Sequence, residues 1–218
     1  MSTENDAYAP ERWFNQKRAQ DCVEALKKNG FTAYFAETKE EAKKLAMAEI
    51  PENATVGFGG SVTVRELGLP EALQEAGHTT FDHWDLSKTP AQKTEARDAQ
   101  VTSDVFLSSS NALTEAGALV NIDGSGNRVG SMIFGPKVSI VICGYNKLVA
   151  GIPEGIERAH KYSAPVNFKR LNLDTPCQKG IDCSQCNPKS CRVTTIIEAP
   201  PGAKKKFVVI VVNEKLGF

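Results

Sequence analysis

The feature that most constrains the fold is the run Val138 to Cys143, in which β-branched and other apolar residues follow one another almost without a break. Such runs are typical of strands that are buried on both faces of a sheet. Shorter strand patterns, including Ala54 to Phe58 and Asp104 to Ser108, alternate with amphipathic helical patterns such as Glu11 to Lys28. Strands that alternate with helices predict an α/β fold, here a three-layer α/β/α domain with a mainly parallel sheet.

The C-terminal part of the chain carries two more strand patterns, Val193 to Glu198 and Phe207 to Asn213, separated by the turn residues Ala199-Pro200-Pro201-Gly202. This arrangement predicts a closing β-hairpin over residues 193–218. The sequence has no internal repeat and no convincing interdomain linker. We therefore expect residues 1–218 to form a single α/β domain, with a cysteine-rich knuckle at 175–192 before the hairpin.

Composition excludes two broad classes of protein. The 26 basic and 26 acidic residues cancel, so no strong field attracts nucleic acid. Met1 to Pro10 is polar and acidic, and no stretch approaches the roughly 18 apolar residues that are needed to span a bilayer. We expect a soluble protein of the cytoplasm that binds neither nucleic acid nor membrane.

The cysteines form the strongest local motif. Four of the six follow the pattern Cys177-x5-Cys183-x2-Cys186-x4-Cys191, and four thiolates this close in sequence can surround one tetrahedral metal ion. The clustering favours a reduced compartment over a disulfide framework. Zinc in a structural role is the first expectation. An iron–sulfur cluster is the alternative, and redox-active or unliganded thiols stay open.

Ligands of open α/β sheets bind beyond the carboxyl ends of the strands. Three loops occupy such positions: Gly59-Gly60-Ser61, Ser108 to Gly117 and Asp123 to Arg128. Glycines, hydroxyls, an amide and a guanidinium in these loops indicate a cleft for a polar or anionic ligand. The predicted ligand-binding residues are Gly59, Gly60, Ser61, Thr63, Asn111, Thr114, Asp123, Gly124, Gly126, Asn127 and Arg128.

Each of these signals also has a purely structural explanation. The glycines after Phe58 could serve a tight turn with positive φ, and Asp123 could simply pair with Arg128 across its loop. The glycines at 124, 126 and 130 follow G-x-G-x-x-x-G, one residue longer than the dinucleotide fingerprint, so a nicotinamide cofactor is not expected.

Glu115 is the predicted catalytic residue. It lies in the otherwise apolar, glycine-flanked segment Thr114-Glu115-Ala116-Gly117, where burial would raise its pKa and suit it to proton transfer or nucleophilic attack. A solvated turn glutamate is the competing interpretation. His83, beside Trp84 at a strand end, is the one histidine with a possible functional position, whereas His78 and His160 are expected to be structural.

Four motifs together resemble the LUD-domain family, which includes lactate utilization protein C-like proteins. They are Gly59-Gly60-Ser61-Val62-Thr63, Asn111 to Gly117, Val120 to Arg128, and Met132-Ile133-Phe134-Gly135-Pro136-Lys137; the resemblance covers about residues 8 to 150. It implies a fold related to ribose-5-phosphate isomerase, glucosamine-6-phosphate deaminase (NagB/RpiA-like) and coenzyme A transferases. It also implies lactate oxidation to pyruvate alongside iron–sulfur oxidoreductase subunits.

The resemblance leaves three functions open. The first is an accessory subunit that binds a small carboxylate or phosphorylated ligand and docks on an iron–sulfur partner. The second is a free-standing isomerase or acyl (coenzyme A) transferase that uses Glu115, although transferases follow this glutamate with asparagine and glycine, whereas Ala116 stands here. The third is an electron-transfer module built on the four cysteines, a segment that resembles a subset of the family.

Overall fold

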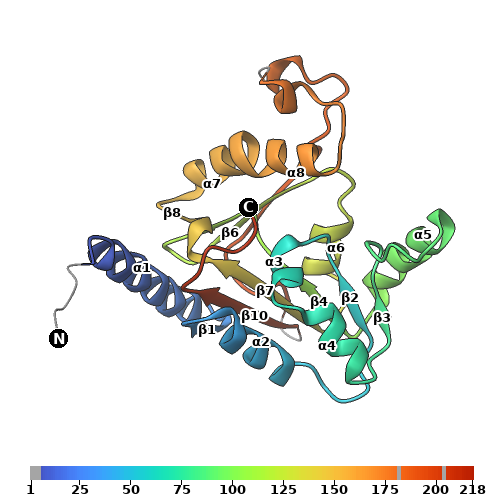
Figure 1. The fold of residues 1–218 in the computed structure, drawn as a ribbon, viewed down its shortest axis with the longest axis horizontal. Helices are drawn as coiled ribbons and strands as arrows, with labels where there is room; N and C mark the ends of the chain where they lie inside the picture. The colour runs from blue at the N-terminus through green and yellow to red at the C-terminus, as the bar shows by residue number, and fades with distance from the viewer. Residues whose placement is uncertain (1–5, 181–182, 203–204) are drawn as a thin grey trace.

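The structure, a computed structural model, describes residues 6–180, 183–202 and 205–218. Its main sheet has six strands in the order β1-β10-β7-β4-β2-β3, and every neighbouring pair is parallel (Figure 1). These strands are β1 (Thr32–Ala36), β2 (Val56–Phe58), β3 (Thr80–Phe81), β4 (Val105–Ser108), β7 (Val138–Gly144) and β10 (Lys206–Val212). The predicted α/β fold with a mainly parallel sheet is confirmed.

A second, four-stranded sheet has the order β8-β5-β6-β9. Its strands are β5 (Ala112–Thr114), β6 (Leu119–Asp123), β8 (Leu148–Val149) and β9 (Val193–Ile197). The α-helices are α1 (Ala9–Lys28), α2 (Lys39–Ala48), α3 (Val62–Glu66), α4 (Leu69–Glu75), α5 (Pro90–Ala99), α6 (Asn127–Ile133), α7 (Ile152–Arg158) and α8 (Ala164–Arg170). Shorter turns are η1 (Gln100–Thr102), η2 (Tyr145–Lys147), η3 (Ala159–Ser163), η4 (Pro176–Lys179) and η5 (Cys183–Gln185).

Strand β10 shows why the chain folds around two cores. Val208, Ile210 and Val212 enter the core under α2, α3 and α4, whereas Phe207 and Val209 enter the core on the opposite face, with α1 and α6. Side chains alternate between the faces of a strand, so an unbroken apolar run can satisfy both cores. Full burial of one such side chain contributes about 1.5–3 kcal/mol. The sheet is therefore held from both sides.

The predicted closing hairpin is wrong. β10 lies between β1 and β7, whereas β9 pairs antiparallel with β6 in the second sheet. Burial explains the separation. Six consecutive residues of β10 are buried, which suits a central strand, whereas β9 alternates between partly buried and exposed positions, which suits a strand with one covered face. Residues 203–204, in the connection between them, lie outside the described residues.

The second sheet also modifies the predicted three layers. Leu113, Leu119, Leu148 and Ile197 from its strands share a core with α1 and the main sheet. α7 then contacts β5 and β6 (Figure 1). One face of the main sheet is thus covered by helices, and the other by α1, α6 and a small sheet with helices of its own. The short strands β5 and β8 carried too little pattern to be predicted.

Local end signals place several elements where the sequence predicts them. α1 ends before Gly30, which adopts φ +90°, and Thr38 and Ser61 cap α2 and α3 by accepting a backbone N–H through their hydroxyls. Ser61 thereby fixes the strand-to-helix turn after β2. Within the described part of the chain, no helix has both the length and the apolar character that a membrane crossing requires.

Candidate functional site

A polar pocket of about 450 Å³ lies beyond the carboxyl ends of β2 and β4. Much of its wall comes from three segments that are far apart in sequence: residues 60–63, residues 109–111, and residues 122–125 with 127–128. Lys147, His83, Trp84, residues from η3 and α8, and residues 190–192 also line it. The structure therefore brings the three predicted loops together around one pocket. That they bind a ligand stays a prediction.

The three loops meet at one pocket for a different geometric reason from the one that the sequence suggests. The loops before Ser61 and after Ser108 follow β2 and β4, which are neighbours in the main sheet. Asp123, however, ends β6 of the second sheet. The pocket is thus formed where the loops of the main sheet meet the edge of the small sheet. The predicted residues that line it are Gly60, Ser61, Thr63, Asn111, Asp123, Gly124, Asn127 and Arg128.

Position 60 must be glycine because a side chain there would collide with Trp84. A Cβ at Gly60 would lie 2.7 Å from the Trp84 ring, and a Cβ at Gly59 would lie 2.8 Å from Ser108 Oγ. Neither glycine has a positive φ. The turn explanation in its positive-φ form is therefore wrong for this loop, and the indole of Trp84 packs directly on the backbone as one wall of the pocket.

Arg128 is fully engaged by the protein. Its guanidinium donates to Ser109 O at 3.0 Å, Asn121 Oδ1 at 2.6 Å, Asn111 Oδ1 at 2.9 Å and Ile122 O at 2.8 Å. Burial lowers the pKa of this guanidinium below its usual value. These contacts pin the loop after β4 to the end of β6, so Arg128 shapes the pocket and contributes charge.

Asp123 is engaged in the same way. Its Oδ1 accepts the backbone N–H groups of Ser125 at 3.1 Å and Gly126 at 2.9 Å, and its Oδ2 accepts that of Val129 at 3.3 Å. The carboxylate lies 3.7 Å from Nε of Arg128. Asp123 and Arg128 therefore do interact across their loop, as the structural explanation requires, and both residues also lie in the pocket wall.

Lys147 is the residue of the site that the sequence analysis missed. It ends η2, directly beyond the carboxyl end of β7, and it is 3% exposed. Its Nζ lies 2.8 Å from Ser109 Oγ and 3.1 Å from Thr63 Oγ1. Burial lowers its pKa to about 8. The rule that nominated the other loops applies to the end of the Val138 strand as well, and would have nominated Lys147.

Arg170, Arg65 and Trp84 form a cationic and aromatic rim beside the pocket. The Cζ atoms of Arg170 and Arg65 lie 4.1 Å and 5.0 Å from the Trp84 ring centroid, and Arg65 is held by Asp82 at 2.6 Å. His83 also lines the pocket, and burial lowers its pKa to about 4, with the charge of Arg97 contributing. The ring of His83 is therefore neutral at physiological pH.

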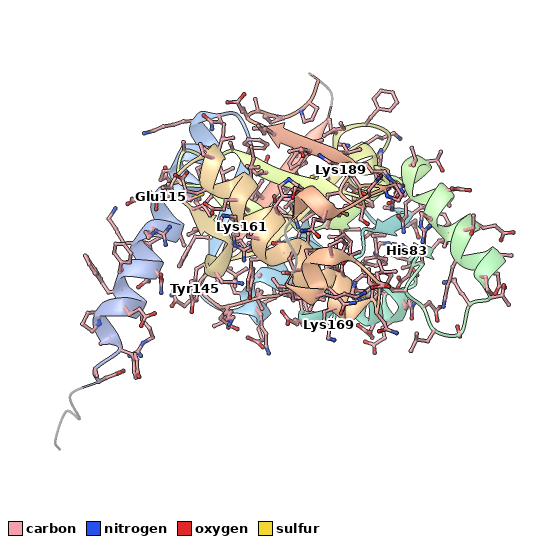
Figure 2. All side chains as sticks on the ribbon, turned by 90° about the horizontal axis from the view of Figure 1, so that it is seen from above. His83, Glu115, Tyr145, Lys161, Lys169 and Lys189 are labelled. Carbon is pink, nitrogen blue, oxygen red and sulfur yellow. The ribbon has the colours of Figure 1, made fainter. Side chains whose placement is uncertain are left out.

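Glu115 lies elsewhere. Its carboxylate accepts from Arg18 Nε of α1 at 2.7 Å, and its side chain is 47% exposed. Figure 2 shows Glu115 and His83 toward opposite ends of the molecule. Thr114 accepts the N–H of Ala118 at 2.9 Å, which closes the turn. Glu115, Thr114, Gly59 and Gly126 are not part of the pocket lining, so their predicted roles have no support from its geometry.

The cysteine segment borders the pocket through Cys191. No disulfide joins the described cysteines. Burial is the main cause that raises the pKa of the Cys191 thiol to about 11, and the neighbouring Cys177, Cys183 and Cys186 contribute to the same rise. Among residues 6–180, 183–202 and 205–218, no three cysteine, histidine or acidic side chains adopt a metal-holding arrangement, so the predicted knuckle is not confirmed.

Comparisons with known proteins give a consistent answer. The crystal structure of a DUF162 family protein from Deinococcus radiodurans is similar in fold, with a TM-score of 0.50 and 11% sequence identity over 92% of this chain and 97% of that one. No curated protein is similar enough in sequence to count as a match. A family model described as LUD domain matches residues 19–212. The chain therefore belongs to the LUD-domain family.

Proposed function

We propose that this protein binds a small anionic metabolite, a carboxylate or phosphorylated acid, in the pocket, and that it assists the oxidation of lactate to pyruvate together with iron–sulfur oxidoreductase subunits. The LUD-domain family is associated with lactate utilisation. The charge balance of the pocket floor is the observation that carries the ligand class.

Three buried or half-buried cations lie in or behind the pocket wall. Lys147 and Arg128 line the pocket. Arg158 lies behind the lining, where its guanidinium donates to Asn111 O, to Ser163 Oγ at 2.8 Å and to Asn146 O at 3.0 Å. Neutral oxygens orient these groups without cancelling their charge. Asp123 is the carboxylate near Arg128, at 3.7 Å, and within the described residues neither Lys147 nor Arg158 forms an ion pair. Isolated buried charges are costly, so an anion that neutralises them would bind favourably.

Calorimetric titration tests this charge argument. We expect lactate, pyruvate or inorganic phosphate to bind, and lactamide, which is neutral and of similar shape to lactate, to bind at least about tenfold more weakly, a difference of about 1.4 kcal/mol. Lys147→Met should abolish binding. Lys161→Met, which removes an exposed lysine paired with Glu157, should not change it. Full affinity in the Lys147 variant would show that the floor does not select the ligand.

The accessory role has a separate test. Tagged protein purified without oxygen from its own cell should carry partner subunits, with iron and acid-labile sulfide in proportion. Lactate oxidation by those subunits should fall when the protein is withdrawn and return when it is added back. Unchanged oxidation in its absence would contradict the assignment.

A second proposal concerns the cysteine segment. The short sequence spacing of Cys177, Cys183, Cys186 and Cys191, and the effect of the other three on the pKa of Cys191, favour a single metal centre, for which we propose structural zinc ahead of an iron–sulfur cluster. Zinc would be held by these four thiolates and would fasten a segment that contributes little to either core. A colourless protein with one zinc per chain is expected. A brown protein with broad visible absorbance would assign the iron–sulfur alternative instead.

A further inference from the structure

Lys147 is arranged in a way that anion binding does not require. The hydroxyl of Ser109 donates to Ile142 O at 2.6 Å, and the hydroxyl of Thr63 donates to Leu216 O at 3.4 Å. Each hydroxyl oxygen is therefore left as an acceptor toward Lys147 Nζ. Two acceptors at 2.8 and 3.1 Å match the two hydrogens of a neutral amine.

An ammonium would carry a third hydrogen at this position. Within the described residues, Lys147 Nζ has no acceptor besides the two hydroxyl oxygens and no carboxylate within ion-pair distance. Burial is the main cause of the lowered pKa of Lys147, and the charges of Arg158 and Arg128 add to it, whereas Cys143 and Glu66 act in the opposite direction. With a pKa of about 8, Lys147 is a cation in most molecules near pH 7 and a neutral amine in the rest. In the neutral form both hydrogens are engaged, and the lone pair is free of protein donors at a residue that lines the pocket.

A buried lysine with an available lone pair is the usual arrangement for nucleophilic attack on a carbonyl. We propose that Lys147 captures the carbonyl carbon of a small 2-oxo acid as an imine, an inference that rests on the anion site proposed above and names its ligand class. The positive charge of Arg128 and Arg158 suits the carboxylate of such an acid, and the carbonyl beside that carboxylate supplies the electrophile.

The chemistry balances without an oxidant or a reductant. Nζ of Lys147 forms a bond to the carbonyl carbon, and the carbonyl oxygen takes up a proton to give a carbinolamine. The oxygen then leaves as water with the two hydrogens that the amine has lost, and a C=N bond remains. Hydrolysis reverses the step. The hydroxyls of Ser109 and Thr63 lie within hydrogen-bond distance of Nζ and are placed to relay these protons.

Reductive trapping tests the inference on the full chain. Protein incubated with pyruvate and sodium cyanoborohydride should gain one reduced pyruvyl group per chain by intact mass, and peptide mapping should place it on Lys147. Lactate, which lacks the carbonyl, should give no adduct and should compete with pyruvate. The adduct should disappear in Lys147→Arg and persist in Lys161→Arg.

The outcomes separate this inference from the proposed anion site. Pyruvate binding by calorimetry without any adduct would overturn the imine and keep the anion site, whereas neither binding nor adduct would overturn both. Equal modification of several lysines would also overturn the inference, because it would show surface reactivity. If Lys147→Arg does not fold, the position of the adduct in the unmodified chain still decides between Lys147 and the other lysines.

Discussion

The backbone N–H of Arg192 donates to the carbonyl oxygen of Asp123 at 2.9 Å. This bond ties the end of the cysteine segment to the loop that carries the pocket wall. Gly124 reinforces the contact, since a Cβ there would lie 3.1 Å from Ser190 O. The position of Cys191 is thus coupled to that of Asp123 through the backbone.

If the proposed metal centre is present, replacing Cys183 and Cys186 by serine should release its metal and loosen this tie. We expect faster proteolysis between Thr175 and Arg192, an intact α/β core and weaker ligand binding, because the segment supplies part of the pocket wall. Metal analysis, limited proteolysis and calorimetry measure these effects. Cys22→Ala, at a buried cysteine of α1, should keep full metal content. Full metal content in the double variant would show the assignment to be wrong.

Gly60→Ala should displace Trp84, since the added Cβ would lie 2.7 Å from the indole. Overpacking of this kind costs about 1–3 kcal/mol. We expect a lower free energy of unfolding and a shift in tryptophan fluorescence. Gly130→Ala is the matched control, because no atom lies within 4 Å of its added Cβ and Gly130 is inside α6, where alanine is favoured by up to about 1 kcal/mol. Equal stability of the two variants would contradict the packing role of Gly60.

The main sheet could be predicted because its strands are buried on both faces. Unbroken apolar runs in the sequence predict β7 and β10. Residues with a local physical role predict the helix ends: the hydroxyl of Thr38 caps α2, and Gly30 adopts a positive φ after α1. Local sequence patterns do not show which strands pair with one another. The turn residues before β10 favoured a hairpin in the prediction. In the structure β10 is buried on both faces and lies in the interior of the sheet, with a neighbouring strand on each edge.

The site was predictable to the same extent. The rule on strand ends nominated the loops after β2 and β4 and also the loop that begins at Asp123, although the strand before Asp123 belongs to the second sheet. Lys147 was missed because a lone lysine in sequence is normally solvated, and only the packing of Thr63 and Ser109 around it creates its environment. The pairing of Glu115 with Arg18 depends on the position of α1, which local patterns do not fix.

Glu115→Gln should leave ligand affinity unchanged, because its carboxylate pairs with Arg18 outside the pocket. A half-exposed ion pair contributes about 0.2–1 kcal/mol, so unfolding should change by no more than that. Arg18→Gln should give the same small change if the pair is the whole interaction. Loss of a measured activity in Glu115→Gln, with binding and stability intact, would instead support the catalytic role that the sequence predicts.

Lys147 should make the stability of the protein depend on pH in the alkaline range. Burial holds its pKa at about 8, below the 10.5 of a solvated lysine. Below pH 8 both states are protonated, and between about pH 8 and 10.5 the unfolded chain binds more protons, so the free energy of unfolding rises with pH across this window. The rise reaches about 3 kcal/mol at most. Urea unfolding at pH 7 and pH 10 measures it.

Lys147→Met should remove the contribution of Lys147 to this rise and leave that of Lys205, whose pKa burial also lowers to about 8. The wild-type protein should therefore gain stability relative to the variant as the pH increases. The sign of the difference at pH 7 depends on two opposing effects. The variant removes a desolvated charge, but it leaves the oxygens of Thr63 and Ser109 without their donor, at a cost of about 1–3 kcal/mol. The difference in slope between the two proteins is free of this ambiguity, because the hydroxyls of Thr63 and Ser109 do not titrate in this pH window, whereas Lys147 does. Lys161→Met, at an exposed position, should retain the wild-type slope. A wild-type slope in Lys147→Met would mean that the pKa of Lys147 is not lowered in the folded protein, so that its neutral amine would be as scarce at neutral pH as that of a solvated lysine, and it would remove the basis for nucleophilic attack.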